Sequence, residues 1–211
     1  MTESSSSKRR RGIDFAHLVR VRMESSGPMP MKKLAMALVI NLEELTTQGH
    51  RDFTLATQRA TLPVGRKAIP KSALEMPAIT AERTFLSKDR HTELVARVTP
   101  YRSEQYAIAS VLNSDAMIML NPTKKIDILE KRNVENVRID GLHTVYAHEE
   151  ILRIGDVTQR IRLIVSSVGQ ALFSIHVTSQ DEFWSWSEIA AIATVQAEKI
   201  QKNAETLLRF F

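Results

Sequence analysis

The stretch from Ile151 to Val177 constrains the fold more than any other part of the chain. Its apolar, β-branched runs are interrupted first by Gly155-Asp156 and then by Ser167-Val168-Gly169. Glycine readily takes the positive φ angles that tight hairpin turns require, so both interruptions are typical of β-turns. The stretch therefore predicts two consecutive hairpins that form an antiparallel meander. It contains no recognisable catalytic motif.

Two amphipathic helices are predicted, one before and one after this meander. The first runs from about residue 31 to 47, and Pro30 suits the first helical position, where its missing N–H costs nothing. The second runs from about residue 186 to 209, and Ser185 with Glu188 fits a capping box at its start. In both segments apolar residues recur every three or four positions, which predicts one apolar stripe per helix. The stripes consist of Met31, Leu34, Ala35, Leu38, Leu42 and Leu45 in the first helix, and of Trp186, Ile189, Ala193, Ala197, Ile200, Ala204, Leu207 and Phe211 in the second.

The remaining segments give weaker signals. Residues 84–99 fit either a strand or a short helix, and residues 106–112 leave the same two alternatives open. The segments predicted as strands are 15–23, 53–62, 116–120, 125–129, 137–139 and, after a turn at Asp140-Gly141, 143–147. Residues 13–211 are thus predicted to form one α+β domain. Its mainly antiparallel sheet contains the meander at 151–177 and is packed by the two helices.

The net charge of +5 is concentrated at the start of the chain. Residues 1–33 hold eight Lys and Arg against three acidic residues, so this segment carries the whole excess. Residues 1–12 have too little apolar surface to fold and are predicted to be a disordered basic arm. A solvated tail is one interpretation, and the alternatives are a nuclear import signal, contact with nucleic acid or contact with an anionic membrane. The residues predicted to bind such a partner are Lys8, Arg9, Arg10, Arg11, Arg20, Arg22, Lys32 and Lys33.

Residues 62–77 form a loop with three regularly spaced apolar-proline pairs. Proline fixes φ and lacks an N–H donor, so this segment is neither a central strand nor a continuous helix. A surface loop that presents such pairs is a candidate for self-association, and a plain connector is the alternative. The residues predicted for self-association are Leu62, Pro63, Arg66, Lys67, Ile69, Pro70, Met76 and Pro77.

The sequence holds no motif for known catalytic or metal chemistry. The seven glycines do not form a phosphate-binding loop, and the chain has no cysteine. His148-Glu149 begins like a zinc-protease helix, but Leu152 occupies the place of the second histidine. His143 and His148 are five residues apart, which places them on opposite faces of a strand. The acidic residues are scattered singly among basic ones, as on a solvated surface. We therefore expect a non-enzymatic protein with no metal, cofactor or small-molecule substrate, in a reducing intracellular compartment.

Aromatic side chains are concentrated where the meander meets the C-terminal helix. Phe183, Trp184 and Trp186 lie within four positions of one another. A core cluster is the favoured interpretation, and a platform for a ligand is the alternative.

The first third of the chain resembles the matrix proteins of rhabdoviruses in the order of its elements. The resemblance covers residues 8–77 and rests on composition rather than on a specific motif. It is carried by Lys8-Arg9-Arg10-Arg11, the strand at 15–23, the turn Gly27-Pro28-Met29-Pro30, the helix from Leu34 to Leu45, and the segment Leu62-Pro63-Val64-Gly65-Arg66-Lys67. The chain departs from the family in lacking Pro-Pro-x-Tyr and Pro-Thr-Ala-Pro motifs, so recruitment of host budding machinery is not implied.

This resemblance implies a viral structural protein. Such a protein self-associates as a homo-oligomer and bridges ribonucleoprotein or RNA to the inner face of an anionic membrane, inside the virion and in the host cytoplasm or nucleus. One alternative is a nucleic-acid-binding protein with a basic arm, either capsid-like or a transcriptional regulator. The other is an enzyme without a visible motif, which a deep polar cleft with converging titratable groups would reveal.

Overall fold

The structure, a computed structural model, describes residues 28–61, 79–89, 91–114, 126–180 and 184–210. Four predicted features lie outside these residues: the basic arm at 1–12, the strand at 15–23, the loop at 62–77 and the strand at 116–120.

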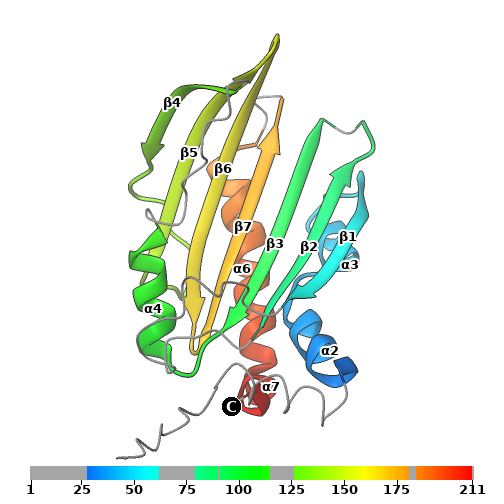
Figure 1. Ribbon diagram of the computed structural model, residues 1–211, viewed down its shortest axis with the longest axis vertical. Helices are drawn as coiled ribbons and strands as arrows, with labels where there is room; N and C mark the ends of the chain where they lie inside the picture. Colours follow the sequence, from blue (N-terminus) through cyan, green and yellow to red (C-terminus); the bar gives the residue numbers. More distant parts are fainter. Residues whose placement is uncertain (1–27, 62–78, 90, 115–125, 181–183, 211) are drawn as a thin grey trace, which may run out of the picture.

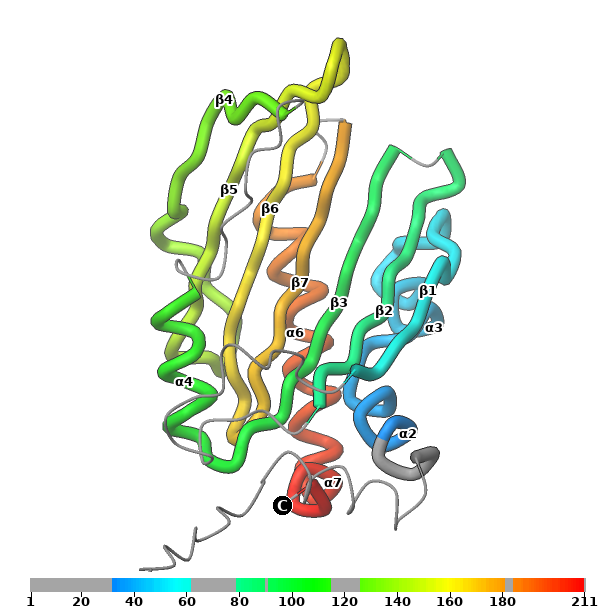
Figure 2. The backbone as a smooth tube through the Cα atoms, viewed as in Figure 1, coloured from blue at the N-terminus to red at the C-terminus, as the bar shows by residue number. Residues whose placement is uncertain are grey.

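The described chain is built on one seven-stranded antiparallel sheet with strand order β1-β2-β3-β7-β6-β5-β4 (Figure 1). Its strands are β1 (Phe53–Thr61), β2 (Thr80–Ser87), β3 (Thr92–Pro100), β4 (Ile126–Asn133), β5 (Val145–Ile154), β6 (Val157–Val168) and β7 (Ala171–Ser179). Figure 2 shows β1 and β4 as the two edges of this sheet. The predicted α+β class, with its mainly antiparallel sheet, is confirmed.

The predicted meander forms β5, β6 and β7. Gly155 has a φ of 61° in the first turn, and Gly169 has a φ of 51° in the second. The second turn was predicted at Ser167-Val168-Gly169, but it consists of Gly169 and Gln170, because β6 continues through Val168. These glycines supply the left-handed conformation that residues with a side chain rarely adopt.

Helices lie on both sides of the sheet. We call the side that carries α2 (Pro28–Leu38), α3 (Leu42–Thr47) and α6 (Trp186–Lys202) the rear face. The opposite side, which faces the viewer in Figure 1 and carries α4 (Glu104–Leu112), is the front face. The chain ends with a short helix α7 (Ala204–Leu207) and a 3-10 turn (Leu208–Phe210).

The prediction of one continuous helix at 31–47 is wrong, because this segment forms two helices, α2 and α3, separated by a short non-helical break. The Asn41 side chain accepts a hydrogen bond from the Glu44 N–H (2.9 Å), and the Glu44 carboxylate accepts one from the Asn41 N–H (2.7 Å). This capping box starts a new helix. Helix α6 also stabilises the break. The side chain of Gln196 accepts a hydrogen bond from the Ile40 N–H (3.1 Å) and donates one to the Leu38 carbonyl (2.7 Å).

The C-terminal helix starts as predicted, because Ser185 and Glu188 form a capping box. Its predicted stripe is buried from Ile189 to Ile200, whereas Ala204 lies beyond the end of α6 and is exposed. The helix ends at Lys202, so the predicted continuous element at 186–209 is three shorter pieces.

The open alternatives are resolved by the structure. Residues 84–99 belong to the hairpin of β2 and β3, and residues 106–112 are helical in α4, which Ser103 caps. Of the strand candidate at 125–129, residues 126–129 belong to β4, and of the candidate at 143–147, residues 145–147 begin β5. The prediction of a strand at 137–139 is wrong, because these residues follow β4 without joining the sheet.

The main core lies between the rear face and its helices. Phe85, Phe173 and Ile175 of the sheet pack there with Ile189 and Ile192 of α6. Each such side chain contributes roughly 1.5–3 kcal/mol when fully buried. A smaller cluster under α4 on the front face consists of Tyr101, Ala107, Val111, Val165 and Leu172. Among the described residues, no helix has both the length and the apolar character needed to cross a membrane.

Candidate functional site

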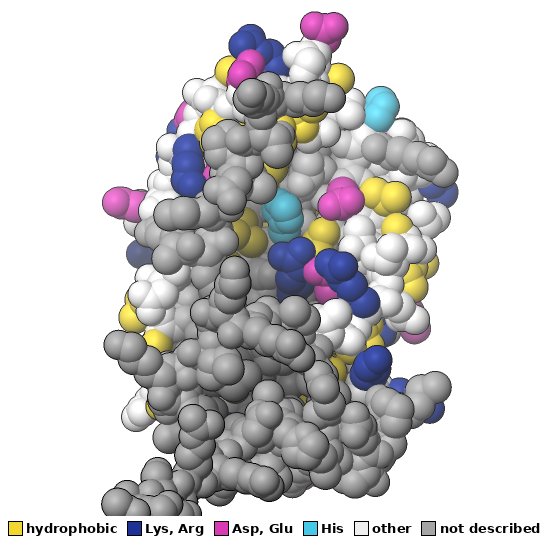
Figure 3. Space-filling view, viewed as in Figure 1, with side chains coloured by type: hydrophobic (Ala, Val, Ile, Leu, Met, Phe, Trp, Pro, Cys, Tyr) yellow, Lys and Arg dark blue, Asp and Glu magenta, His cyan; other side chains and the backbone are white. Residues whose placement is uncertain are grey.

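Among the described helices, α4 is the one that packs on the front face, and it lies at one end of that face. Helix α4 packs against β6 and β7 near Val165 and Leu172. Figure 3 shows basic, acidic and histidine side chains gathered near the middle of this face. We call this region the front polar site. Its central residues are Arg59, Glu82, Arg97, Ser174, His176 and Thr178.

A buried carboxylate organises the front polar site. Glu82 on β2 faces Arg59 on β1 and Arg97 on β3, because strand pairing places all three in one row. The Glu82 side chain is only 8% exposed, while Arg59 and Arg97 are 63% and 43% exposed. Arg59 donates from Nε to Glu82 Oε1 (2.8 Å), and Arg97 donates from Nε to Oε2. Two guanidinium groups on one carboxylate leave this row with a net charge of +1.

His176 lies on the neighbouring strand β7, between Val95 and Leu163 in the sheet. Burial of the imidazole, helped by the positive charge of Arg97, lowers the pKa of His176 to about 4. Glu150 and Glu82 oppose this shift only in part. His176 is therefore neutral at pH 7, and its Nε2 lies 3.5 Å from the Thr178 hydroxyl.

A second polar group occupies the front face at the β4 edge. Asn133 Oδ1 accepts from the Tyr146 hydroxyl (2.9 Å) and lies 2.8 Å from His148 Nδ1. His148 Nε2 is 3.0 Å from Glu150 Oε1, which also pairs with Lys131 at 3.2 Å. The other carboxylate oxygen of Glu150 is buried without a hydrogen-bond partner. The sequence around His148 did not fit a zinc-protease motif. Among the described residues, no group of three or more His, Asp or Glu side chains could hold a metal ion.

On the rear face, Glu149 is surrounded by arginines. Arg162 Nε donates to Glu149 Oε1 (2.7 Å), Arg132 donates to Oε2 (2.5 Å), and Arg160 lies 3.7 Å away. Burial by itself would raise the pKa of Glu149, but the hydrogen bonds from Arg162 and Arg132 outweigh it and hold this pKa below its ordinary value. Arg162 also stacks over Trp186, with Cζ 5.5 Å from the ring centroid.

These ion pairs correct the interpretation of the acidic residues as scattered on a solvated surface. Glu82, Glu149 and Glu150 are all buried. Strand register explains the error, because the arginine and lysine partners of these three residues come from other strands and lie 11 to 23 positions away in the sequence.

The aromatic residues near the start of α6 belong to the core, as the favoured interpretation predicted. Trp184 and Trp186 pack against the main core. The Trp184 ring stacks on His50 at 4.9 Å and meets the edge of Phe53 at 5.9 Å. Burial lowers the pKa of His50, and Glu188 opposes this shift. Phe183 lies outside the described residues.

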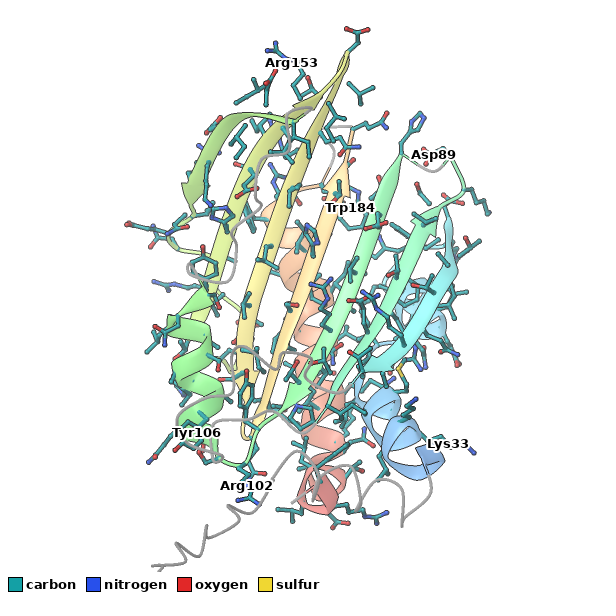
Figure 4. All side chains as sticks on the ribbon, viewed as in Figure 1. Lys33, Asp89, Arg102, Tyr106, Arg153 and Trp184 are labelled. Carbon is teal, nitrogen blue, oxygen red and sulfur yellow. The ribbon has the colours of Figure 1, made fainter. Side chains whose placement is uncertain are left out.

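The site residues predicted from sequence are placed away from the front polar site or lie outside the described chain. Lys32 and Lys33 are exposed on α2, and Figure 4 shows Lys33 directed away from the sheet. The structure does not describe Lys8, Arg9, Arg10, Arg11, Arg20, Arg22, Leu62, Pro63, Arg66, Lys67, Ile69, Pro70, Met76 or Pro77. The roles assigned to these residues stay predictions.

The front polar site was missed because its members are far apart in the sequence. Arg59 and His176 are separated by more than 110 positions, and only the strand order brings them together. The segments around Glu82 and Arg97 do not alternate regularly between polar and apolar residues, and residues 84–99 fitted either a strand or a helix. No signal in the sequence therefore placed these two side chains on one face.

Comparison with solved structures identifies a similar fold. The extracellular domain of PknH from Mycobacterium tuberculosis matches with a TM-score of 0.56 and 10% sequence identity, over 81% of this chain and 96% of that chain. A protein of Mycobacterium smegmatis described as an Rv0999 ortholog matches with a TM-score of 0.45 and 9% identity, over 82% of this chain and 98% of that chain. At 10% identity, the property shared with the PknH domain is the fold. No protein-family model and no curated protein sequence matches the chain.

The similarity to the PknH domain contradicts the resemblance to rhabdovirus matrix proteins. That resemblance rested on the order of elements within residues 8–77, most of which the structure does not describe, whereas the structural match covers 81% of the chain. The prediction of a viral matrix protein of the virion is therefore wrong. The predicted partners, which are a second copy of the chain, RNA or nucleoprotein and an anionic membrane, stay predictions. The prediction of a reducing intracellular compartment is contradicted too, because the similar chain is an extracellular domain.

Proposed function

We propose that this protein is a non-catalytic binding domain whose front polar site takes up a small anionic ligand. The observation that carries this proposal is the row Arg59–Glu82–Arg97, in which one buried carboxylate holds two partly exposed guanidinium groups. The row sits on the part of the front face that α4 leaves uncovered.

The two arginines are suited to an anion because their positions are fixed before a ligand arrives. Arg59 contacts Glu82 through Nε and Nη2, and Arg97 contacts it through Nε. The two arginine side chains are nevertheless 63% and 43% exposed, so they can still be reached from solvent. Guanidinium groups bind carboxylate and phosphate oxygens through paired N–H donors. A side chain that is already held in place loses less conformational entropy on binding, which favours affinity.

The neighbouring groups supply uncharged hydrogen-bonding partners. His176 is neutral at pH 7, so it adds no second positive charge and offers one donor and one acceptor nitrogen. Thr178 and Ser174 lie on the same face of β7. This combination fits a ligand with one carboxylate or phosphate group on a polar, hydroxyl-bearing body.

Binding rather than catalysis is supported by the state of Glu82. Both of its oxygens already accept hydrogen bonds from arginine, so the carboxylate is not placed to remove a proton from a substrate. The fold is shared with an extracellular domain, which is compatible with a place outside the cytoplasm.

Isothermal titration calorimetry with inorganic phosphate and with acetate tests the proposal. We expect saturable binding of at least one anion, with an affinity that falls as salt rises. Arg97→Gln should weaken it about tenfold or more, as expected for a lost charge-assisted hydrogen bond. Arg209→Gln, an exposed arginine after α7, is the matched control. Absence of saturable binding of both anions, or equal loss in the two variants, would contradict the proposal.

A further inference from the structure

The two edges of the sheet differ in charge. Edge strand β1 has a single charged residue, Arg59, among nine. Edge strand β4 has the sequence Ile-Asp-Ile-Leu-Glu-Lys-Arg-Asn, with acidic residues before basic ones, and it is exposed along nearly its whole length. Two apolar side chains at its centre, Ile128 and Leu129, are 39% and 50% exposed. No described strand pairs with the outer side of β4, and an edge strand of this kind can pair with another strand.

A β-bulge in β4 brings its opposite charges to one face. Register with β5 pairs Asp127 with Arg153 and Arg132 with Glu149, and it shifts between Ile128 and Glu130. Asp127 and Arg132 are five residues apart, so a regular strand would place them on opposite faces. The additional residue in the bulge places both on the rear face instead.

We propose that β4 is a dimerisation edge, on which a second copy of this chain pairs antiparallel across a two-fold axis at the bulge. In this register Asp127 faces Arg132 of the partner subunit on the rear face. The two-fold axis makes this contact twice. Opposite charges on directly facing residues stabilise an antiparallel strand pair.

The proposed pairing completes a row of alternating charge through both sheets. Within one chain, Arg162 contacts Glu149 (2.7 Å) and Glu149 contacts Arg132 (2.5 Å). In the partner, Asp127 contacts Arg153 (3.1 Å). Joining Arg132 to the partner's Asp127 gives the order positive, negative, positive, negative, positive across five strands.

Three other registers bring like charges together. Moving the partner by two residues sets Asp127 against Glu130, and moving the two-fold axis from the bulge to Asp127 or to Arg132 sets that residue against its own copy. Like charges on directly facing residues are destabilising. The proposed register also places Ile128 on the front face opposite Lys131, whose aliphatic stem can cover it.

The expected dimer is weak. An eight-residue strand pair buries less surface than a standard interface of about 1,600 Å². Sedimentation velocity on the full chain should therefore show a monomer–dimer equilibrium that shifts with protein concentration.

Charge reversal tests the contact. Asp127→Arg places two arginines face to face at both symmetric positions, and we expect about a tenfold or greater increase in the dimer dissociation constant. Thr57→Arg, an exposed position on the opposite edge strand, is the control and should leave the equilibrium unchanged. An equimolar mixture of the Asp127→Arg and Arg132→Asp chains should recover dimers, because each then meets an opposite charge. Thermal melts verify that both variants fold.

Cross-linking tests the register, since the chain has no native cysteine. Facing Cα atoms in an antiparallel pair lie about 4.5–5.5 Å apart, which a disulfide can span. Mixing an Ile128→Cys chain with a Lys131→Cys chain should give a cross-linked heterodimer, and neither chain alone should cross-link efficiently. A chain that stays monomeric at every concentration, or a dimer insensitive to Asp127→Arg, would overturn the proposal.

Discussion

The two faces of the sheet are built from the same seven strands but have opposite characters. The rear face is covered by α2, α3 and α6, and its central side chains are apolar and fully buried. Its charged cluster around Glu149 lies towards the β4 edge. The front face carries α4 at one end, and its middle holds arginine, glutamate and a neutral histidine. Adjacent residues of one strand show the difference, because Phe85 of β2 packs into the core while Thr84 is on the front face.

The two faces therefore have different roles, because the rear face stabilises the fold and the front face is available to bind a ligand. The rear face buries enough apolar surface to hold the domain together. The front face therefore tolerates polar groups in its middle, provided that they pair with one another, as Glu82 does with Arg59 and Arg97. We expect substitutions in the apolar core of the rear face to lower stability strongly, and substitutions in the front polar site to alter binding.

The largest effect on stability is expected at Phe85, which is fully buried on the rear face. Phe85→Ala should lower the free energy of unfolding by about 3–5 kcal/mol, because it removes apolar contacts and leaves a cavity. Denaturant titration measures this change. Thr84→Ala on the front face of the same strand is the control and should cost less than about 1 kcal/mol. Similar losses in both variants would break the distinction between the faces.

The next effect concerns the link between α6 and the break after α2. Gln196→Met should cost about 2–3 kcal/mol, because the Ile40 N–H and the Leu38 carbonyl lose a buried partner. Gln201→Met, on the exposed side of the same helix, is the control for helix propensity. Equal stability of the two variants in denaturant would show that the rear face does not depend on this contact.

A smaller, pH-dependent effect is expected at His176 on the front face. Its pKa is about 4 in the folded protein against 6.5 in the unfolded chain, so the unfolded state binds more protons between these values. Stability should therefore fall as pH drops from about 6.5 towards 4, by roughly 1–2 kcal/mol between pH 7 and 5. His176→Gln should flatten this part of the curve of unfolding free energy against pH. An unchanged curve would mean that the imidazole is not buried as described.

The smallest effect on stability is expected at Arg97. Arg97→Gln should change the unfolding free energy by less than about 1 kcal/mol, since Arg97 is partly exposed and Glu82 retains Arg59. The same variant should lose anion binding. A large loss of stability without a loss of binding would reverse the roles assigned to the two faces.

Local signals in the sequence were sufficient for much of the scaffold. Gly155 and Gly169 mark the turns of the meander, and Ser185 with Glu188 marks the start of α6. These features depend on residues within a few positions of each other. The break between α2 and α3 also had a local signal, because Asn41 and Glu44 have the spacing of a capping box. The continuous apolar stripe from Met31 to Leu45 concealed it.

The front polar site was not predictable in the same way. Its arrangement follows from strand order, which pairs β3 with β7 across more than 70 positions. Glu82 and Arg97 are each ordinary surface residues until the register places them face to face. The resemblance to matrix proteins was wrong for a related reason, since element order in one segment does not determine how the whole chain is assembled.

The most direct test of the central claim is an NMR titration with inorganic phosphate at pH 7 that follows the arginine Nε–H signals. The account predicts saturable shifts for Arg59 and Arg97 on the front face, and none for Arg162, which is buried beside Glu149 on the rear face. Shifts confined to Arg162, or no saturable shift at Arg59 and Arg97, would contradict it.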